Sequence, residues 1–339
     1  MTNFWAKLNR PIYALAPMAG VTDSAFRQIC KKFGADVVYS EMASATALTY
    51  SPEKTLEMLK FAPNEQPYVV QLFGSQPSHF ARAAELISEG KIPVWFLEKG
   101  EFGKKKGIGE VKKKEIVRPA GIDINFGCPV KKVQKQGAGA ALMDNLKLAR
   151  EIVKAVTANT DLPVSIKCRT AAGEVDVLRF LDKLSDLDIK AVMIHGRTLT
   201  QGFSGPIDIE IIKKAPGVFG GLVLANGGIV GHKEAVRVLA ETGADGIGIA
   251  RGALGRPWIF KAVRTGQSVK RSQRAVFKVA LEHAQLADFL KGEWGIIEMR
   301  KHLCWYVSGL PGARVLRQKL VQVKDLTDIR RILKTTDIR

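Results

Sequence analysis

Short apolar, β-branched runs in this sequence repeatedly end in polar or glycine-rich residues. Runs of this composition are typical of strands that are buried on both faces. The carboxyl ends of neighbouring parallel strands meet at one edge of a sheet, where their side chains can bind a ligand together. The residues at these ends are Pro17-Met18-Ala19-Gly20, Glu41-Met42, Gln71, Asn125-Phe126-Gly127-Cys128-Pro129, Lys167-Cys168-Arg169, His195-Gly196-Arg197, Asn226-Gly227-Gly228 and Ala250-Arg251-Gly252.

The last two of these ends indicate a phosphate site. Asn226-Gly227-Gly228 lets the backbone approach a ligand closely, because glycine has no Cβ. Ala250-Arg251-Gly252 adds a cation and a second flexible turn. Backbone N–H groups at such turns and at helix N-termini bind anions.

Lys167 follows an apolar run, where a lysine is costly unless it meets an anion or a ligand. Two chemistries fit and stay open at this point. Lys167 could form a Schiff base with a carbonyl substrate, or it could place positive charge beside the N1/O2 edge of a reduced flavin. Gln71 could hydrogen-bond the polar edge of the same ring, and we expect His195 to contact the ligand as well.

Cys128 differs from the other three cysteines because it lies in a turn between Gly127 and Pro129. The following lysines favour a thiolate and burial favours a thiol, so the sequence leaves the protonation state open. Cys30 lies on the apolar stripe of a helix, and we expect Cys168 and Cys304 to be packing residues too. The four cysteines are scattered without a CxxC pair, so neither a disulfide framework nor a metal site is expected.

The elements that must position these residues alternate between strand and helix. Thr22 and Asp23 can cap a first helix, whose apolar stripe ends before Gly34. Eight strand–helix units predict a closed (β/α)8 TIM barrel, an α/β fold with its site at the carboxyl ends of the strands. The predicted strands are residues 12–16, 37–40, 68–72, 122–125, 164–167, 191–194, 222–224 and 246–249.

Two regions depart from this alternation. Residues 91–120 contain glycines and two lysine triplets and interrupt the barrel as a lysine-rich insertion. After about residue 260 only helical patterns remain, at 274–290, 297–306 and 313–321. We therefore expect a barrel domain over residues 1–262 and a small all-helical C-terminal domain over residues 263–339.

The charge of the chain points to a polyanionic partner. The formal net charge is +19. Residues 261–339 hold 17 Lys and Arg against 7 Asp and Glu, a net charge of +10. An excess concentrated in one region fits nucleic-acid binding, although a solvated basic surface is the alternative. No run is long and apolar enough to span a bilayer and the N-terminus lacks a signal peptide, so we expect a cytoplasmic protein without a membrane partner.

Taken in barrel order, these motifs resemble the tRNA-dihydrouridine synthases, particularly the bacterial B-type branch. The resemblance covers nearly the whole chain. It rests on Ala16-Pro17-Met18-Ala19-Gly20-Val21-Thr22-Asp23, Gln71-Leu72-Phe73-Gly74, Asp123-Ile124-Asn125-Phe126-Gly127-Cys128-Pro129, Lys167-Cys168-Arg169, His195-Gly196-Arg197-Thr198, Asn226-Gly227-Gly228-Ile229, Gly255-Arg256-Pro257-Trp258, Arg300-Lys301-His302 and Gly309-Leu310-Pro311-Gly312.

The resemblance implies FMN as the bound cofactor, NADPH as the reductant, tRNA as the substrate and the C-terminal domain as an RNA-binding domain. A monomer is expected. Cys128 would donate a proton to C5 of the uracil after hydride reaches C6, and Asn125, Arg169 and Arg197 would bind the substrate. The residues implied around the FMN are Pro17, Met18, Ala19, Gln71, Lys167, His195, Asn226, Gly227, Gly228, Ala250 and Arg251.

Two features depart from the family pattern. Ala250 stands where the family commonly has glycine, and the insertion at 91–120 is longer than the family's pattern predicts. Other functions also stay open on the sequence. They are an FMN-dependent barrel oxidoreductase acting on a free small molecule such as a dihydroorotate-like substrate, a Schiff-base lyase using Lys167, and a non-catalytic RNA-binding barrel.

Overall fold

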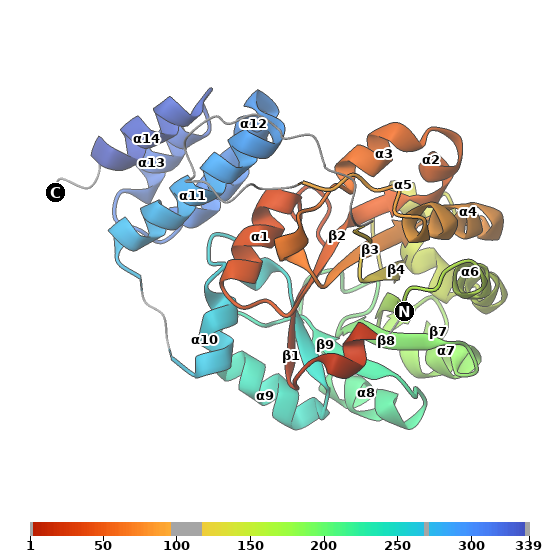
Figure 1. Ribbon diagram of the computed structural model, residues 1–339. Helices are drawn as coiled ribbons and strands as arrows, with labels where there is room; N and C mark the ends of the chain where they lie inside the picture. Colours follow the sequence, from red (N-terminus) through yellow and green to blue (C-terminus); the bar gives the residue numbers. More distant parts are fainter. Residues whose placement is uncertain (1–2, 96–116, 268–270, 336–339) are drawn as a thin grey trace.

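A computed structural model of the chain describes residues 3–95, 117–267 and 271–335. Eight parallel strands close into a barrel in the order β1-β10-β9-β8-β5-β4-β3-β2 (Figure 1). The predicted TIM barrel and all eight of its predicted strands are thereby confirmed. The strands are β1 Ile12–Leu15, β2 Val37–Ser44, β3 Tyr68–Phe73, β4 Gly121–Phe126, β5 Val164–Arg169, β8 Ile189–His195, β9 Leu222–Asn226 and β10 Gly246–Ile249.

Helices surround the barrel as the alternation predicts. The first begins after Asp23, whose carboxylate accepts a hydrogen bond from the Phe26 amide, and Gly34 follows it with a φ of 98°. A two-stranded hairpin, β6 Ala171–Ala172 and β7 Val175–Asp176, follows β5. The helices of the barrel are α1 Ser24–Lys32, α2 Ala45–Tyr50, α3 Pro52–Met58, α4 Pro77–Ser88, α5 Lys131–Gln134, α6 Leu146–Ala158, α7 Val177–Leu184, α8 Ile209–Lys214, α9 His232–Thr242 and α10 Ile259–Thr265.

Apolar side chains fill the barrel on both sides of its wall. Trp5 lies in a short 3-10 helix, Phe4–Lys7, and packs with inward-facing strand residues such as Tyr39 and Met193. A larger cluster packs the outer faces of the strands against the helices, and it includes both Cys30 and Cys168, as expected. Toward the carboxyl ends the inward-facing side chains become polar, which leaves that end of the barrel for ligand binding.

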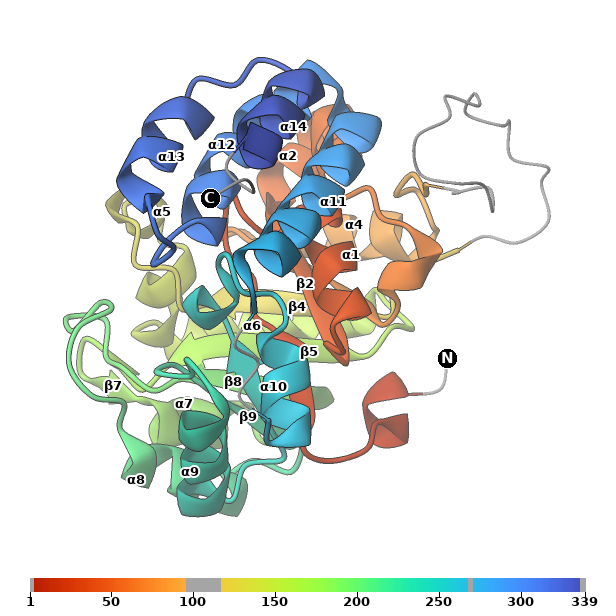
Figure 2. The same cartoon turned by 90° about the vertical axis from the view of Figure 1, so that its left-hand side faces the viewer.

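Four helices form the C-terminal region: α11 Gln273–Lys291, α12 Glu293–Tyr306, α13 Ala313–Leu320 and α14 Leu326–Thr335. The first three were predicted, whereas α14 was not. Figures 1 and 2 show α11 beside α1, where Ala25 and Ile29 share one apolar core with the C-terminal helices. Because this core includes barrel residues, the division at residue 262 stays a prediction. Residues 96–116, most of the predicted lysine-rich insertion, lie outside the described part of the chain.

Candidate active site

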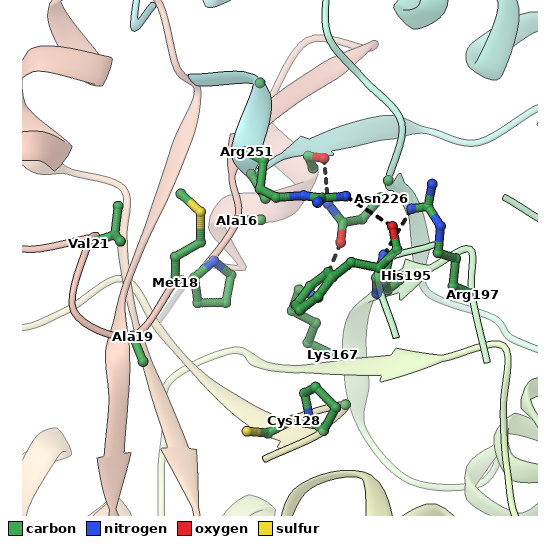
Figure 3. A pocket seen from close by; sticks show the side chains of 18 of the residues that line it. Ala16, Met18, Ala19, Val21, Cys128, Lys167, His195, Arg197, Asn226 and Arg251 are labelled. Atoms are coloured by element: carbon green, nitrogen blue, oxygen red, sulfur yellow. Dashed lines mark hydrogen bonds between the residues drawn. The ribbon is translucent and has the colours of Figure 1, made fainter. Parts of the chain in front are cut away.

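A cavity of about 540 Å³ opens at the carboxyl ends of the barrel strands. All fifteen site residues predicted from the sequence line it, although their individual roles stay predictions. Figure 3 shows Arg251 and Asn226 at one end of the cavity and Cys128 at the other. The fifteen are Pro17, Met18, Ala19, Gln71, Asn125, Cys128, Lys167, Arg169, His195, Arg197, Asn226, Gly227, Gly228, Ala250 and Arg251.

The corner formed after β9 and β10 has the properties of an anion site. Gly227 has a φ of 119°, and a Cβ at this position would come within 2.9 Å of the Ile207 side chain. Among the described residues, no backbone or side-chain acceptor bonds the Gly228 N–H. The 3-10 helix Arg251–Ala253 begins at the same corner, and the first N–H groups of a helix have no intrahelical partner. Gly227, Gly228 and Arg251 line the same cavity, so backbone donors and a guanidinium are both present at this corner.

Lys167 lies at the centre of the site and is tied to this corner. Its Nζ donates to Asn226 Oδ1 at 3.3 Å, and Asn226 Nδ2 donates to the Gly248 carbonyl at 2.7 Å. Burial lowers the pKa of Lys167 to about 8, and the Asp123 carboxylate opposes that shift. Lys167 is thus mainly protonated at neutral pH, and its ammonium group retains N–H donors for a polar ligand.

His195 is neutral in this environment. Burial, followed by the charges of Lys167, Arg169, Arg197 and Arg251, holds the pKa of His195 far below its usual value. Its Nε2 lies 3.4 Å from Arg197 Nη1. A guanidinium can only donate, so Nε2 accepts and the imidazole proton lies on Nδ1.

Arg169 and Arg197 hold the loop of residues 198–207 that follows β8. Arg169 Nη1 donates to the carbonyls of Thr198 and Gly202, both at 2.9 Å, and its Nε donates to the Gly127 carbonyl at 2.8 Å. Within the described chain, Arg169 Nη2 has no such bond and is available to a ligand. Each guanidinium nitrogen of Arg197 is bonded to the loop or to His195. The observed bonds of Arg197 hold the loop in place, and substrate binding by Arg197 stays a prediction.

The turn that carries Cys128 is fixed by the preceding strand. Asn125 Oδ1 accepts hydrogen bonds from the Gly127 amide at 3.0 Å and from the Cys128 amide at 2.9 Å. The Cys128 thiol group lines the cavity, and the residue is only partly buried. Cys30 and Cys168 are buried, and burial raises the pKa of Cys168 to about 12. Cys304, which we expected to be a packing residue, is only half-buried and belongs to none of the apolar clusters.

Two aromatic residues of the cavity wall were not predicted from the sequence. Phe203 lies in the loop 198–207, where the Arg251 guanidinium is 5.0 Å from its ring centroid. Trp305 comes from α12 and so brings the C-terminal helices into the site. The backbone of Trp305 packs so closely on Gly255 that a Cβ added to Gly255 would collide with the Trp305 carbonyl. An aromatic residue shortly after Arg300-Lys301-His302 was the available signal for Trp305, but only the docked helix shows that Trp305 lines the cavity.

The described residues hold neither a metal site nor a membrane-spanning helix. No group of three or more His, Cys, Asp and Glu side chains could hold a metal ion in residues 3–95, 117–267 and 271–335. In the same residues no helix combines the length and apolarity required to cross a membrane.

The fold is that of a (β/α)8-barrel enzyme, and its cavity opens at the carboxyl ends of the strands. The chain belongs to the dihydrouridine synthase (Dus) family, whose model matches residues 14–93 and 111–338. The unmatched residues 94–110 lie inside the lysine-rich insertion.

Curated relatives agree with the family assignment. The probable tRNA-dihydrouridine synthase 1 of Synechocystis sp. is 33% identical over 92% of this chain and 84% of its own length. The tRNA-dihydrouridine synthase B of Pseudomonas aeruginosa is 34% identical over 92% of this chain and 88% of its own length.

Solved structures share the fold at much lower identity. Histamine dehydrogenase from Rhizobium sp. 4-9 aligns with a TM-score of 0.52 and 12% identity, covering 97% of this chain and 62% of that chain. Morphinone reductase in complex with tetrahydroNAD aligns with a TM-score of 0.50 and 10% identity, covering 80% of this chain and 92% of that chain. These identities show the barrel fold alone.

Proposed function

We propose that this protein reduces specific uridines of tRNA to 5,6-dihydrouridine, with FMN as the bound cofactor and NADPH as the reductant. The chain belongs to the dihydrouridine synthase family, and its relatives are named for this reaction on tRNA. The observation that carries the proposal is that Cys128, Lys167 and the two glycine-rich turns line one and the same cavity.

The residues of the cavity fit FMN. Gly227, Gly228, Ala250 and Arg251 would hold its phosphate, because they combine backbone donors with a guanidinium. Lys167 and Gln71 would face the polar edge of the flavin ring. Pro17, Met18 and Ala19 supply a wall beside it.

Bound FMN, once reduced by NADPH, supplies the hydride that the uracil C6 accepts. Cys128 then donates its thiol proton to C5, which completes the reduction of the C5=C6 bond. Asn125 holds the Cys128 turn through two backbone amides, and Arg169 Nη2 offers a donor to a uracil carbonyl. The uridine must leave its base stack to reach this cavity, which costs a few kcal/mol.

The basic C-terminal helices would bind the tRNA, whose phosphates offset the cost of extruding the uridine. We also propose that the protein acts as a cytoplasmic monomer. The described cysteines are all free, which fits a reducing compartment.

The proposed function is tested with the purified protein and unmodified tRNA. The protein should be yellow, release FMN on denaturation, and form dihydrouridine in tRNA when NADPH is supplied. A colourless protein that takes up no added FMN contradicts the flavin proposal and leaves a lyase or a binding protein. A flavoprotein that reduces free dihydroorotate-like compounds but not tRNA favours a small-molecule oxidoreductase. Mapping dihydrouridine in tRNA from a deletion strain would then identify the modified position.

Lys167→Ala should weaken FMN binding about tenfold to a hundredfold, because a hydrogen bond to a charged group contributes about 1.5–3 kcal/mol. The measurement is an FMN titration of the apoprotein, followed by flavin fluorescence. Lys147→Ala, which removes an exposed lysine of α6, is the matched control and should bind FMN normally. Equal FMN affinity in both variants would remove the role given to Lys167.

Trp305→Ala should lower kcat/KM for tRNA about tenfold to a hundredfold while leaving the reduction of FMN by NADPH unchanged. The reason is that Trp305 is an aromatic wall of a cavity that receives a nucleobase, and stacking of a base on an aromatic ring contributes about 1–3 kcal/mol. Trp305→Phe keeps a ring and should retain most of the activity. If Trp305→Ala turns over tRNA like the wild type, the ring does not contact the substrate.

A further inference from the structure

A buried carboxylate, Asp123, lies beside the cavity but does not line it. Asp123 of β4 is in register with Gln71 of β3 and with Ser165 of β5, so the three side chains occupy one level of the barrel interior. Asp123 is 0% exposed. Its Oδ2 accepts a hydrogen bond from Gln71 Nε2 at 2.7 Å, and its Oδ1 accepts one from Ser165 Oγ at 2.6 Å.

The hydrogen bonds continue from this carboxylate to the turn that carries Cys128. Gln71 Oε1 accepts from Asn125 Nδ2 at 3.0 Å. Asn125 Oδ1 in turn accepts from the amides of Gly127 and Cys128. One chain of hydrogen bonds therefore runs from Asp123 through two side-chain amides to the backbone of the Cys128 turn.

The direction of this chain is fixed at both ends. A backbone N–H can only donate, so Asn125 must present its oxygen to the turn and its nitrogen to Gln71. An ionised carboxylate can only accept, so Gln71 must present its nitrogen to Asp123 and its oxygen to Asn125. Turning either amide over would bring two donors or two acceptors together in a buried site, where unmade hydrogen bonds are costly.

We propose that Asp123 is a positioning residue that sets the orientation of the Gln71 and Asn125 amides in the cavity. The proposal rests on the proposed function for the identity of the ligands. In this orientation Gln71 Nε2 retains one N–H, whereas Asn125 Nδ2 directs its second N–H at the Met42 sulfur, 3.8 Å away, a weak acceptor that a ligand carbonyl can replace. The flavin ring and the uracil ring both carry carbonyl oxygens, which accept hydrogen bonds. Asp123 thus prepares the site to bind ring carbonyls without contacting either ligand itself.

The burial of Asp123 supports this role. Removing a carboxylate from water is unfavourable, and burial raises the pKa of Asp123 to about 6, against the opposing hydrogen bonds from Gln71 and Ser165. Asp123 forms no direct ion pair within the described residues, and the charge of Lys167, which acts at longer range, also opposes the rise of its pKa. An apolar residue at this level of the barrel would avoid the cost of burial, but it would leave Gln71 Nε2 without an acceptor.

The first test compares two substitutions of Asp123. Asp123→Leu removes the acceptor and should weaken FMN binding to the apoprotein about tenfold to a hundredfold. Asp123→Asn can still accept from Gln71, because its amide nitrogen can donate to the Ser165 hydroxyl, and FMN affinity should stay within about threefold of wild type. Ser165→Ala leaves the carboxylate bond to Gln71 intact and should also bind FMN normally. Wild-type FMN affinity in Asp123→Leu, or equal losses in the Asn and Leu variants, would overturn the proposal.

The second test exchanges the acid and the amide between positions 123 and 125 of the hydrogen-bond chain. It tests the proposal even if Asp123→Leu does not fold. Asn125→Asp alone forces Gln71 to turn its oxygen toward the Asp123 carboxylate, so the apoprotein should unfold at a lower temperature. Adding Asp123→Asn supplies a donor to that oxygen, and the unfolding temperature of the double variant should recover most of the loss. If the decreases in unfolding temperature of the two single variants add up in the double variant, the two residues act independently and the proposal is contradicted.

These outcomes are distinguishable from a failure of the proposed function. The unfolding temperatures belong to the apoprotein, so they test the hydrogen-bond chain whatever the ligand is. FMN binding and dihydrouridine formation by the wild-type protein test the function itself.

Discussion

Cys128→Ala is expected to lower the rate of dihydrouridine formation roughly 10²–10⁴-fold, the usual contribution of a general acid. The thiol group lines the cavity and the turn that carries it is held by Asn125, so the substitution removes a proton donor without disturbing the anion-binding corner. The bound FMN should remain reducible by NADPH, since that step involves no uracil. The decisive measurement is single-turnover oxidation of pre-reduced protein by unmodified tRNA.

Substitutions of the remaining cysteines are the controls. Cys30→Ala and Cys168→Ala remove buried side chains and should reduce stability through the cavities they leave, with little effect on the chemistry. Cys304→Ala should change less, because this residue is only half-buried. Cys128→Ser should also react slowly, since a hydroxyl is a much weaker acid than a thiol with a pKa of about 8.5. A wild-type rate in Cys128→Ala would mean that water or another residue protonates C5.

The location of the site could be predicted because a closed barrel leaves little freedom in where its strand ends lie. Once eight apolar runs are assigned to parallel strands, their carboxyl ends must meet around one mouth. Residues as distant in sequence as Pro17 and Arg251 therefore line the same cavity. The glycines after β9 were informative for the same reason, because a positive φ and a close approach leave a local trace in the sequence.

The parts that could not be predicted depend on contacts between distant segments. Trp305 reaches the cavity only because α12 docks against Gly255, and no periodicity in α12 indicates that docking. The bonds of Arg197 depend on the path of the loop 198–207. Asp123 is a single acid within an apolar run, and its partners become evident only when β3, β4 and β5 are placed in register.

Neutralising α13 is expected to weaken tRNA binding roughly tenfold to a hundredfold at low salt, because three solvent-exposed charge contacts contribute up to about 1 kcal/mol each. This helix begins shortly after Trp305 in the sequence, and Trp305 lines the cavity. It buries Leu316 and Leu320 and exposes Arg314, Arg317 and Lys319, which makes the three cations available to RNA.

The variant is the triple substitution Arg314→Gln, Arg317→Gln and Lys319→Gln. Deleting the C-terminal helices would be less informative, because Ala25 and Ile29 of α1 pack in their core and would become exposed. The matched control, Lys147→Gln with Lys154→Gln and Lys213→Gln, removes the same charge from exposed positions on α6 and α8. These two helices lie across the barrel from α13 (Figure 1).

Both triple variants should keep their FMN, and only the α13 variant should lose tRNA affinity. Each phosphate contact releases counterions, so the logarithm of the binding constant falls linearly with the logarithm of the salt concentration. Loss of three contacts should make that slope shallower by about 2 to 3. Equal losses in the two variants would show that net charge alone drives binding. An unchanged slope and affinity in the α13 variant would place the tRNA on another surface of the protein.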